Sequence, residues 1–189
     1  MDEKTTRTVQ RILKVNHAGE FGAIRIYRAQ LFVSKLLHRD LVAFLAHTLS
    51  HEVDHCQKFL SAMPAYQGRP CRMMWLWGMG GYLLGLLTAL MGRNAIMICT
   101  ASVEKTVHVH LEDQVRFLNK RDDGLRALIQ EIQIEENEHL EFAETNMKPS
   151  VLHRPLYGLI AASTELVIWL STQGDVTKMK KAISQSSSV

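Results

Sequence analysis

The stretch HEVDH (residues 51–55) has a counterpart later in the chain in EENEH (residues 135–139). Each contains a glutamate followed three positions later by a histidine, Glu52 with His55 and Glu136 with His139. Residues three apart lie on one face of an α-helix, so each pair can direct a carboxylate and an imidazole at the same metal ion. One such pair is a weak signal, because chance supplies about half an occurrence in a chain of this composition.

The spacing between the two stretches is a stronger signal than either stretch alone. The separation of Glu52 from Glu136 equals that of His55 from His139, and the same separation leads from Glu20 to Glu104. We call this common separation the repeat step. A glutamate followed at a fixed distance by a Glu-x-x-His pair therefore occurs twice, at positions 20 and 52 and again at 104 and 136. This order predicts two helix pairs, related by a pseudo-two-fold axis, that each contribute half of one site.

The rest of the chain also has a helical pattern. Its four prolines fall in two pairs, and no strand-like alternation extends beyond a few residues. We predict helices over about 7–37, 40–63, 94–119, 124–147 and 155–172. The expected fold is an all-α four-helix bundle in one domain (1–175), with an apolar helical insert (about 73–92) between the halves and an extra C-terminal helix. We expect a disordered tail over 176–189.

The composition is that of an ordinary folded domain. The chain has 189 residues, 47% hydrophobic and 22% charged, which suffices to bury a core. A formal charge of +3 is too small to favour nucleic acid, and we expect no such partner. Three cysteines without short spacing, and no secretory signal, predict reduced thiols in a cytoplasm-like compartment.

The four glutamates and two histidines form a chemically consistent metal-binding set. Four carboxylates balance the charge of two divalent ions, which removes the large cost of burying unpaired negative charge in a bundle. Oxygen-rich ligands without thiolate favour iron or manganese over zinc. The alternative, surface glutamates of amphipathic helices, accounts well for Glu135, Glu138, Glu141 and Glu144. It does not account for Glu20, which lies among small and apolar residues in HAGEFGA (17–23).

Several stretches together resemble one known family. VNHAGEFGA (15–23), HEVDH, ASVE (101–104) and EENEH, with the apolar insert, resemble the demethoxyubiquinone hydroxylases of ubiquinone biosynthesis over about residues 9–170. The resemblance implies a ferritin-like di-iron fold and a monooxygenase that uses O2 to hydroxylate the benzoquinol ring of a polyprenylated substrate. It also implies an external reductant, NADH, although the chain has no nucleotide-binding glycine motif.

The resemblance further implies which residues hold the iron. The family's ligands fall without a gap on Glu20, Glu52, His55, Glu104, Glu136 and His139. By analogy with related sites, Glu52 and Glu136 would bridge the two ions, and Glu20 and Glu104 would each be a terminal ligand of one ion.

The chain departs from the family pattern near two of these ligands. Asn16 and Phe21 replace the aspartate and tyrosine that flank the first motif in many members. Many members also have a His-His-Tyr run that ends at position 111, where this chain has leucine and so offers no tyrosine for a route of electrons. His17 and His108 lie one helical turn from Glu20 and Glu104, which makes them candidates to hydrogen-bond those ligands; His110 and His51 are weaker candidates.

The uncharged stretch 73–91 suggests where a lipid quinol would be met. It could span a bilayer as a helix, but one crossing would put Glu104 and Glu136 on the opposite side from Glu20 and Glu52. The stretch should therefore dip into one leaflet or lie at the interface, with Arg69, Arg72 and Arg93 outside. We expect a peripheral protein at the cytoplasmic face of the inner (cell) membrane. A core helix or an oligomer contact is the alternative.

Three other functions compete with this interpretation. A ferritin- or rubrerythrin-like iron-handling or peroxide-reducing protein would share the ligands, but the three cysteines cannot form the four-cysteine module that rubrerythrins usually carry. A hydroxylase of modified tRNA nucleosides would need a basic, aromatic-lined surface. A membrane-bound helical interaction module would have glutamates that merely face water. The sequence leaves open the tail length of the quinone, the electron donor, a homo-oligomer and a lipid-presenting helper protein.

Overall fold

Every regular element of the protein is a helix in residues 1–151 and 153–186, which the computed structural model describes. The helices are α1 (Glu3–Leu37), α2 (Val42–Ala62), α3 (Met74–Leu90), α4 (Arg93–Leu118), α5 (Asp123–Asn146), α6 (His153–Ser171) and α7 (Asp175–Ser186). Short 3-10 turns, Arg39–Leu41 and Met63–Tyr66, follow α1 and α2. The predicted all-α fold is confirmed, and the predicted helix boundaries lie within a few residues of those observed.

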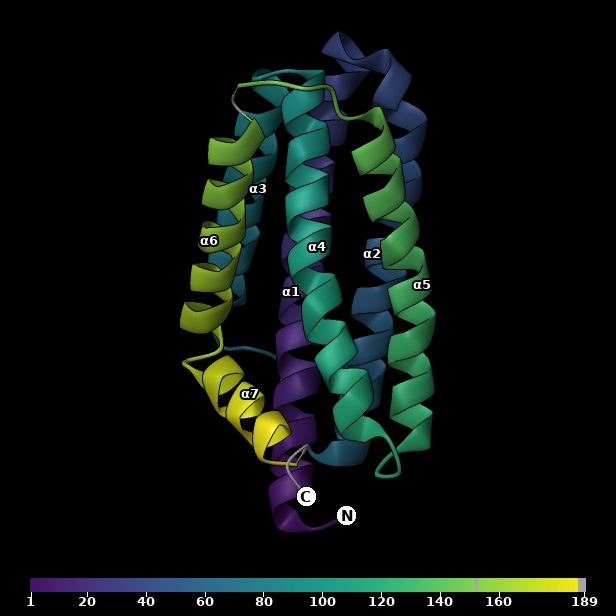
Figure 1. Cartoon of the computed structure of the whole chain (residues 1–189), viewed down its shortest axis with the longest axis vertical. Coiled ribbons are helices and arrows are strands. Elements are labelled where there is room, and N and C mark those ends of the chain that lie inside the picture. Colours follow the sequence, from purple (N-terminus) through teal and green to yellow (C-terminus); the bar gives the residue numbers. More distant parts are fainter. Residues whose placement is uncertain (152, 187–189) are drawn as a thin grey trace.

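The helices from α1 to α6 form two halves of three helices each. In Figure 1, α1 and α4 lie in the middle, α2 and α5 on one side, and α3 and α6 on the other. Within each half the first helix packs against the other two: α1 against α2 and α3, and α4 against α5 and α6. The repeat step moves α3 onto 158–174, which overlaps α6. The apolar insert and the extra C-terminal helix are therefore counterparts in the same repeat.

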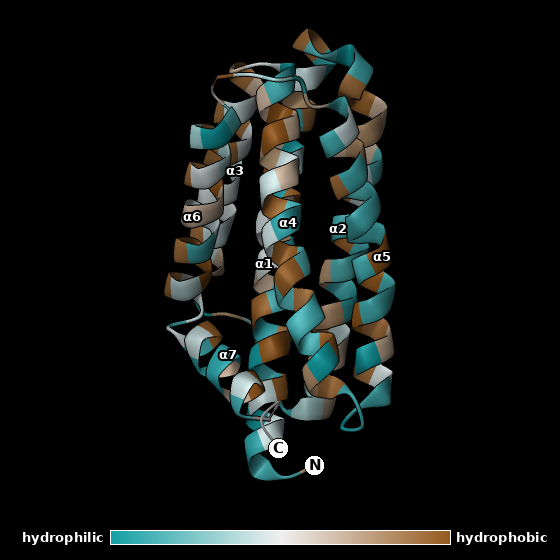
Figure 2. Ribbon diagram, viewed as in Figure 1, coloured by the Kyte–Doolittle hydropathy of each residue, from teal (hydrophilic) through white to brown (hydrophobic). Residues whose placement is uncertain are grey.

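Helix α3 lies unusually close to α1. A Cβ atom built on Gly81 would come within 2.4 Å of the carbonyl oxygen of Gly22, and one on Gly85 within 2.3 Å of that of Ile26. The two backbones can approach this closely because glycine has no side chain there. The face of α3, the apolar insert, that contacts α1 is thus fixed against the bundle. Figure 2 shows many hydrophobic residues along α3 and along its neighbour α6.

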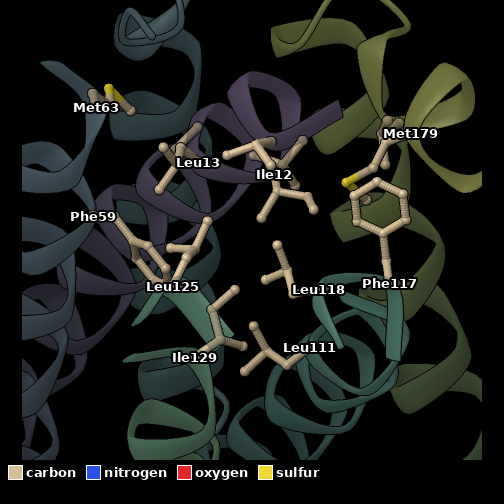
Figure 3. Packing of buried hydrophobic residues seen from close by; sticks show 14 of the residues in the cluster. Ile12, Leu13, Phe59, Met63, Leu111, Phe117, Leu118, Leu125, Ile129 and Met179 are labelled. Atoms are coloured by element: carbon tan, nitrogen blue, oxygen red, sulfur yellow. The ribbon is translucent and has the colours of Figure 1, made fainter. Parts of the chain in front are cut away.

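Two apolar clusters hold the four central helices together. The cluster shown in Figure 3 joins α1, α2, α4 and α5 near the N-terminal end of α1, through fully buried side chains such as Leu13, Phe59 and Ile129. The second cluster joins the same helices nearer the other end of the bundle, and includes Tyr27 and Leu45. Along each of these four helices, the predicted metal ligands lie between the residues of the first cluster and those of the second.

The prediction of a disordered tail over 176–189 is wrong for the described part of that range. Residues 175–186 form α7, which buries Val176, Met179 and Ile183 against the first cluster. Asp175, the first residue of α7, forms an ion pair with Lys14 of α1. The serine-rich composition hid these apolar residues, which recur at helical spacing. Residues 187–189 of the predicted tail lie outside the described residues.

Candidate metal centre

The structure brings all six predicted ligands together between the two apolar clusters. Helix α1 supplies Glu20, α2 supplies Glu52 and His55, α4 supplies Glu104, and α5 supplies Glu136 and His139. None of the six is more than 5% exposed. Buried carboxylates are rare unless they are paired or bind a metal, so this concentration in one place indicates a functional centre.

The six side chains form two overlapping groups of four. Glu20, Glu52, His55 and Glu136 have ligand atoms within 4.8 Å of one another, and so do Glu52, Glu104, Glu136 and His139. The groups share Glu52 and Glu136, the two residues for which the resemblance implies a bridging role. Each group contains one histidine and one unshared glutamate, which is an arrangement suited to two adjacent cations.

Both histidines direct the Nδ1 atom towards the carboxylates. His55 Nδ1 lies 3.0 Å from Glu136 Oε1 and 3.9 Å from Glu20 Oε2. His139 Nδ1 lies 3.6 Å from Glu52 Oε1 and 3.5 Å from Glu136 Oε2. Each Nδ1 atom is thus placed to complete the donor set of one group.

The Nε2 atoms of His55 and His139 form hydrogen bonds with two residues that sequence reasoning missed. His55 Nε2 donates to Glu135 Oε2 (2.6 Å), and His139 Nε2 is hydrogen-bonded to His51 Nδ1 (3.1 Å). Hydrogen bonds of this kind hold a ligand imidazole in orientation. Glu135, assigned to the surface from the sequence, therefore supports the ligand His55. His51, a weaker candidate in the sequence, supports His139. A signal was available, because residues 51 and 135 are also related by the repeat step.

Tyr27 is a further residue that sequence reasoning missed. Its buried hydroxyl on α1 donates a hydrogen bond to Glu104 on α4, and burial together with this carboxylate raises the pKa of Tyr27 well above its usual value. The repeat step leads from Tyr27 to Leu111, which is equally buried and cannot offer a hydroxyl to Glu20. The tyrosine missing from this chain at position 111 is thus the pseudo-symmetric counterpart of Tyr27.

The other histidines do not take the roles expected of them. His17 is buried, which lowers its pKa, and His17 Nδ1 has no hydrogen-bond partner among the described residues. His108 Nε2 lies 3.5 Å from the carboxylate of Glu112 rather than against Glu104. His110 is buried and its Nε2 is 2.9 Å from Glu165 Oε1 on α6.

The charges of the site fit two divalent cations. Burial and the carboxylate of Glu136 raise the pKa of Glu20 to about 7, and burial with neighbouring carboxylates raises the pKa values of Glu52 and Glu104 well above the usual range. Glu52 Oε1, Glu136 Oε2 and His139 Nδ1 are buried without a hydrogen-bond partner in the described structure. Two divalent ions would pair these atoms and balance four carboxylates, and the absence of thiolate from the donor set favours iron or manganese.

An apolar cavity of about 370 Å³ adjoins the site between α1, α3, α4 and α6. The four glutamates form part of its wall, and the remainder is mostly apolar, with valine, leucine and isoleucine side chains together with glycines, Ala23 and Trp77. Its volume is within the range of small-molecule sites. The polar residues of the wall, apart from the glutamates, are Asn16, His110, Ser163 and Thr164.

Comparisons with known proteins agree with this geometry. Residues 7–171 match the model of the family described as ubiquinone biosynthesis protein COQ7, so α7 follows the matched region. The NADPH-dependent 3-demethoxyubiquinone 3-hydroxylase of Dictyostelium discoideum mitochondria is 35% identical over 176 residues, and its Homo sapiens counterpart 34% over 179. The 3-demethoxyubiquinol 3-hydroxylase of Rhodospirillum rubrum is 34% identical over 171 residues. Each alignment covers 90% of this chain and 80% of the relative. The chain therefore belongs to the COQ7 family of ubiquinone biosynthesis proteins.

Proposed function

We propose that this protein is a di-iron monooxygenase that hydroxylates the benzoquinol ring of a polyprenylated 3-demethoxyubiquinol with O2. The observation that carries the proposal is the pair of overlapping four-residue donor groups in the wall of an apolar cavity. The names of the relatives, 3-demethoxyubiquinone and 3-demethoxyubiquinol 3-hydroxylases, supply the substrate class. The reaction belongs to ubiquinone biosynthesis, in keeping with the family.

The proposed ligand roles follow the two donor groups. Glu20 and His55 would hold one iron, Glu104 and His139 the other, and Glu52 and Glu136 would bridge them. When bound, iron would supply the activation of O2, with one oxygen atom going to the ring and the other leaving as water at the expense of two electrons from an external reductant. The protein holds the ligand histidines in orientation through Glu135 and His51, and the apolar clusters above and below keep water from the site.

The cavity wall has the composition needed to position a quinol ring. Val103, Val107 and Ile168 offer apolar surface to the ring, and a few polar groups remain for its oxygens. Asn16 exchanges two amide hydrogen bonds with Gln114, of 2.8 and 2.9 Å, and His110 is held by Glu165. These fixed side chains can hydrogen-bond ring oxygens without losing much side-chain entropy.

The lipid tail of the substrate would leave the cavity towards an exposed apolar face. We define this face by Trp75, Met79, Tyr82, Leu83, Leu87 and Leu90 of α3 and Leu159, Leu166, Trp169 and Leu170 of α6, which are 40–67% exposed. Leu83 and Leu87 belong to both the face and the cavity wall, so the two are continuous. No helix in the described residues is long and apolar enough to cross a membrane. We propose that the face lies in one leaflet, in a peripheral association on the cytoplasmic side.

One residue of the uncharged stretch 73–91 lies in the core, and Arg93, expected outside the membrane, is bound within the bundle. Trp77 is 5% exposed and packs over Gly22, so it belongs to the core rather than to the interface. Arg93 Nε donates to Asp40 Oδ2 (2.6 Å) and its Nη1 to the carbonyl oxygen of Asn146 (3.0 Å). Arg93 therefore connects the start of α4 to the end of α5 and to the turn before α2.

A flotation assay with phosphatidylethanolamine–phosphatidylglycerol liposomes tests the membrane proposal. A triple variant with Trp75→Asp, Leu87→Asp and Leu90→Asp should remain in the soluble fraction, whereas the unchanged protein should float. The matched control replaces Val53, Leu60 and Ile134, exposed apolar residues of α2 and α5, by aspartate and should float. Equal flotation of all three proteins would contradict the proposal.

The reductant is proposed from the relatives rather than from the site. The names of the Dictyostelium discoideum and Homo sapiens relatives specify NADPH, where the resemblance led us to expect NADH. We propose an external nicotinamide reductant. A comparison of the two nucleotides in the hydroxylation assay would show which one this chain uses.

An isotope experiment tests the hydroxylation itself. Iron-loaded protein, a short-chain demethoxyubiquinol, a nicotinamide reductant and ¹⁸O2 should give a product that contains one ¹⁸O atom, and the second ¹⁸O atom should leave as water. Glu52→Ala should abolish the product, whereas Glu138→Ala, on the exposed side of α5, should leave it unchanged. A wild type that forms no hydroxylated quinone, or an equally active Glu52→Ala variant, would refute the proposal. Iron loading by the hundreds without hydroxylation would favour the storage alternative.

A further inference from the structure

Three histidines form a line from solvent to the metal centre between α2 and α5. His47 is exposed, the side chain of His51 is 23% exposed, and His139 is buried. His47 and His51 lie four positions apart on α2, with ring centroids 4.2 Å apart. His51 Nδ1 lies 3.1 Å from His139 Nε2, and ligand atoms of all three histidines lie within 4.8 Å of one another. This separation allows the three side chains to share one cation.

The buried site needs metal ligands between it and the solvent, because a hydrated cation cannot reach it easily. The six predicted ligands are at most 5% exposed, and the cavity on the other side of the site is mostly apolar. A divalent ion that enters must exchange its water for protein ligands step by step, because its desolvation without replacement is very costly. Neutral imidazole is a good ligand for divalent iron, cobalt and zinc.

We propose that His47, His51 and His139 form an uptake route that captures a divalent transition-metal ion at the surface and passes it to the buried carboxylates. The proposal rests on the metal centre of the proposed function. His139 can belong to both stages, since its Nε2 faces His51 and its Nδ1 faces Glu52 and Glu136. No redox change is involved: the ion replaces the protons that the buried carboxyl groups hold, and these protons leave to solvent.

The positions that the repeat step relates to the three histidines do not offer a cation a free path to the site. The repeat step leads from His47 to Glu131 and from His51 to Glu135, and His139 corresponds to His55. Lys58 Nζ binds Glu131 Oε1 at 2.8 Å, so a cation already occupies the outermost position. The counterpart of Lys58 is Phe142, which stacks on Phe44 and carries no charge. The repeat is therefore asymmetric at the point where a metal ion would enter.

A purely orienting role would explain His51 but not His47. His51 hydrogen-bonds a predicted ligand, as expected of a residue that fixes an imidazole ring. His47 contacts the ring of His51 and is exposed. Its replacement should therefore change how fast metal arrives and not how the loaded site is built.

The test uses Co²⁺ alone as a probe with metal-free protein. Stopped-flow absorption follows the rate of cobalt uptake, and elemental analysis gives the final content. His47→Ala should slow uptake about tenfold, the low end of the effect on affinity when a metal-supporting residue is lost. Its final content should equal that of the wild type. His47→Asp, which restores a ligand, should recover most of the rate, and His153→Ala on α6 should have no effect.

The outcomes separate this proposal from the metal centre itself. If His47→Ala loads as fast as the wild type and to the same content, the uptake route is refuted and the metal centre stands. If the wild type binds no cobalt, the metal centre is refuted and the uptake route with it. A His47→Ala variant that loads slowly and is not rescued by His47→Asp would also overturn the proposal, because the loss would then not be that of a ligand.

Discussion

Glu20 and Glu104, which each belong to only one of the two donor groups, have different neighbours, although the repeat places them in equivalent positions. Glu104 accepts a hydrogen bond from Tyr27, whereas the residue equivalent to Tyr27 in the other half is Leu111. A phenol that donates to a ligand carboxylate fixes its orientation and stabilises its negative charge. The two metal positions should therefore differ in affinity, with the position of Glu104 and His139 better supported.

Tyr27→Phe tests this difference. The substitution removes the hydroxyl and keeps the ring in the core, so the fold should be retained. We expect the affinity of one of the two Co²⁺ ions to fall by roughly tenfold to a hundredfold, with the other little changed. Isothermal titration of the metal-free protein measures both affinities. Unchanged binding at both positions, or an equal loss at both, would contradict the assignment of Tyr27 to the Glu104 side.

The six predicted ligands could be recognised from the sequence, and the repeat step also relates His51 to Glu135, but the contact made by Tyr27 could not be predicted. The repeat step and the Glu-x-x-His spacing are properties of the sequence, and they identified six residues that the structure brings together. Tyr27 carries no such spacing signal of its own. Its role depends on the distance between α1 and α4, which only the packed structure defines.

Helix α3 is held to the bundle by close backbone contact with α1, and this makes it sensitive to a single methyl group. At Gly85 an added Cβ atom would lie 2.3 Å from the carbonyl oxygen of Ile26 and 2.8 Å from its Cα atom. These are backbone atoms, which cannot turn aside as a flexible side chain can.

Gly85→Ala should destabilise the protein by about 1–3 kcal/mol through this overpacking. Gly80 lies on the same helix, and a Cβ atom there would meet nothing within 4 Å. Gly80→Ala should be neutral or stabilise by about 0.5–1 kcal/mol, because alanine is the better helix former. Urea denaturation of the two variants measures the difference. Equal stability would show that α1 and α3 are not in close contact.

Helix α7 is part of the core although its composition suggested otherwise. Met179 is 1% exposed and packs in the cluster that contains Ile12 and Phe117. We expect Met179→Ala to lower the free energy of unfolding by about 2–3 kcal/mol, since truncation of a buried methionine leaves a cavity. Lys178→Ala, on the exposed side of α7, is the control. If both variants unfold at the same denaturant concentration, α7 does not pack on the bundle.

The helices were easier to predict than the tail for a physical reason. Helices α1 to α6 have long apolar stripes or, in α3, an uncharged run. The apolar stripe of α7 consists of three buried residues among lysines and serines. Its spacing is helical, but so short a stripe does not indicate that α7 packs on α1, α4 and α6, the helices that it contacts.

The molecule as a whole is built around a cluster of buried carboxyl groups, so its stability should depend on both pH and metal. The folded pKa of Glu20, about 7, exceeds its ordinary value of 4.5, and the pKa values of Glu52 and Glu104 are also raised. A group with a raised pKa favours the folded state below its unfolded pKa and loses this contribution as the pH rises through the folded pKa. His55, whose pKa is raised to about 9, contributes in the same direction.

Metal-free protein should therefore become less stable as the pH rises from about 6.5 to about 9, above the range in which the lowered pKa of His17 acts in the opposite direction. The melting temperature should fall across this range, and bound Co²⁺ should reduce the fall because it replaces the protons that the carboxyl groups must otherwise retain. Differential scanning calorimetry with and without metal measures both effects. A metal-free melting temperature that rises steadily over the same range would contradict the charge balance described for the site.

The most direct test of the account is the iron content and Mössbauer spectrum of protein purified anaerobically from iron-replete cells. Two irons per chain are predicted for the wild type, with a spectrum of a coupled pair. Glu20→Ala and Glu104→Ala should each lose chiefly one iron, from opposite sides of the shared carboxylates. One iron or fewer in the wild type, or two irons retained in both variants, would contradict a pair of ions held between the two halves of the chain.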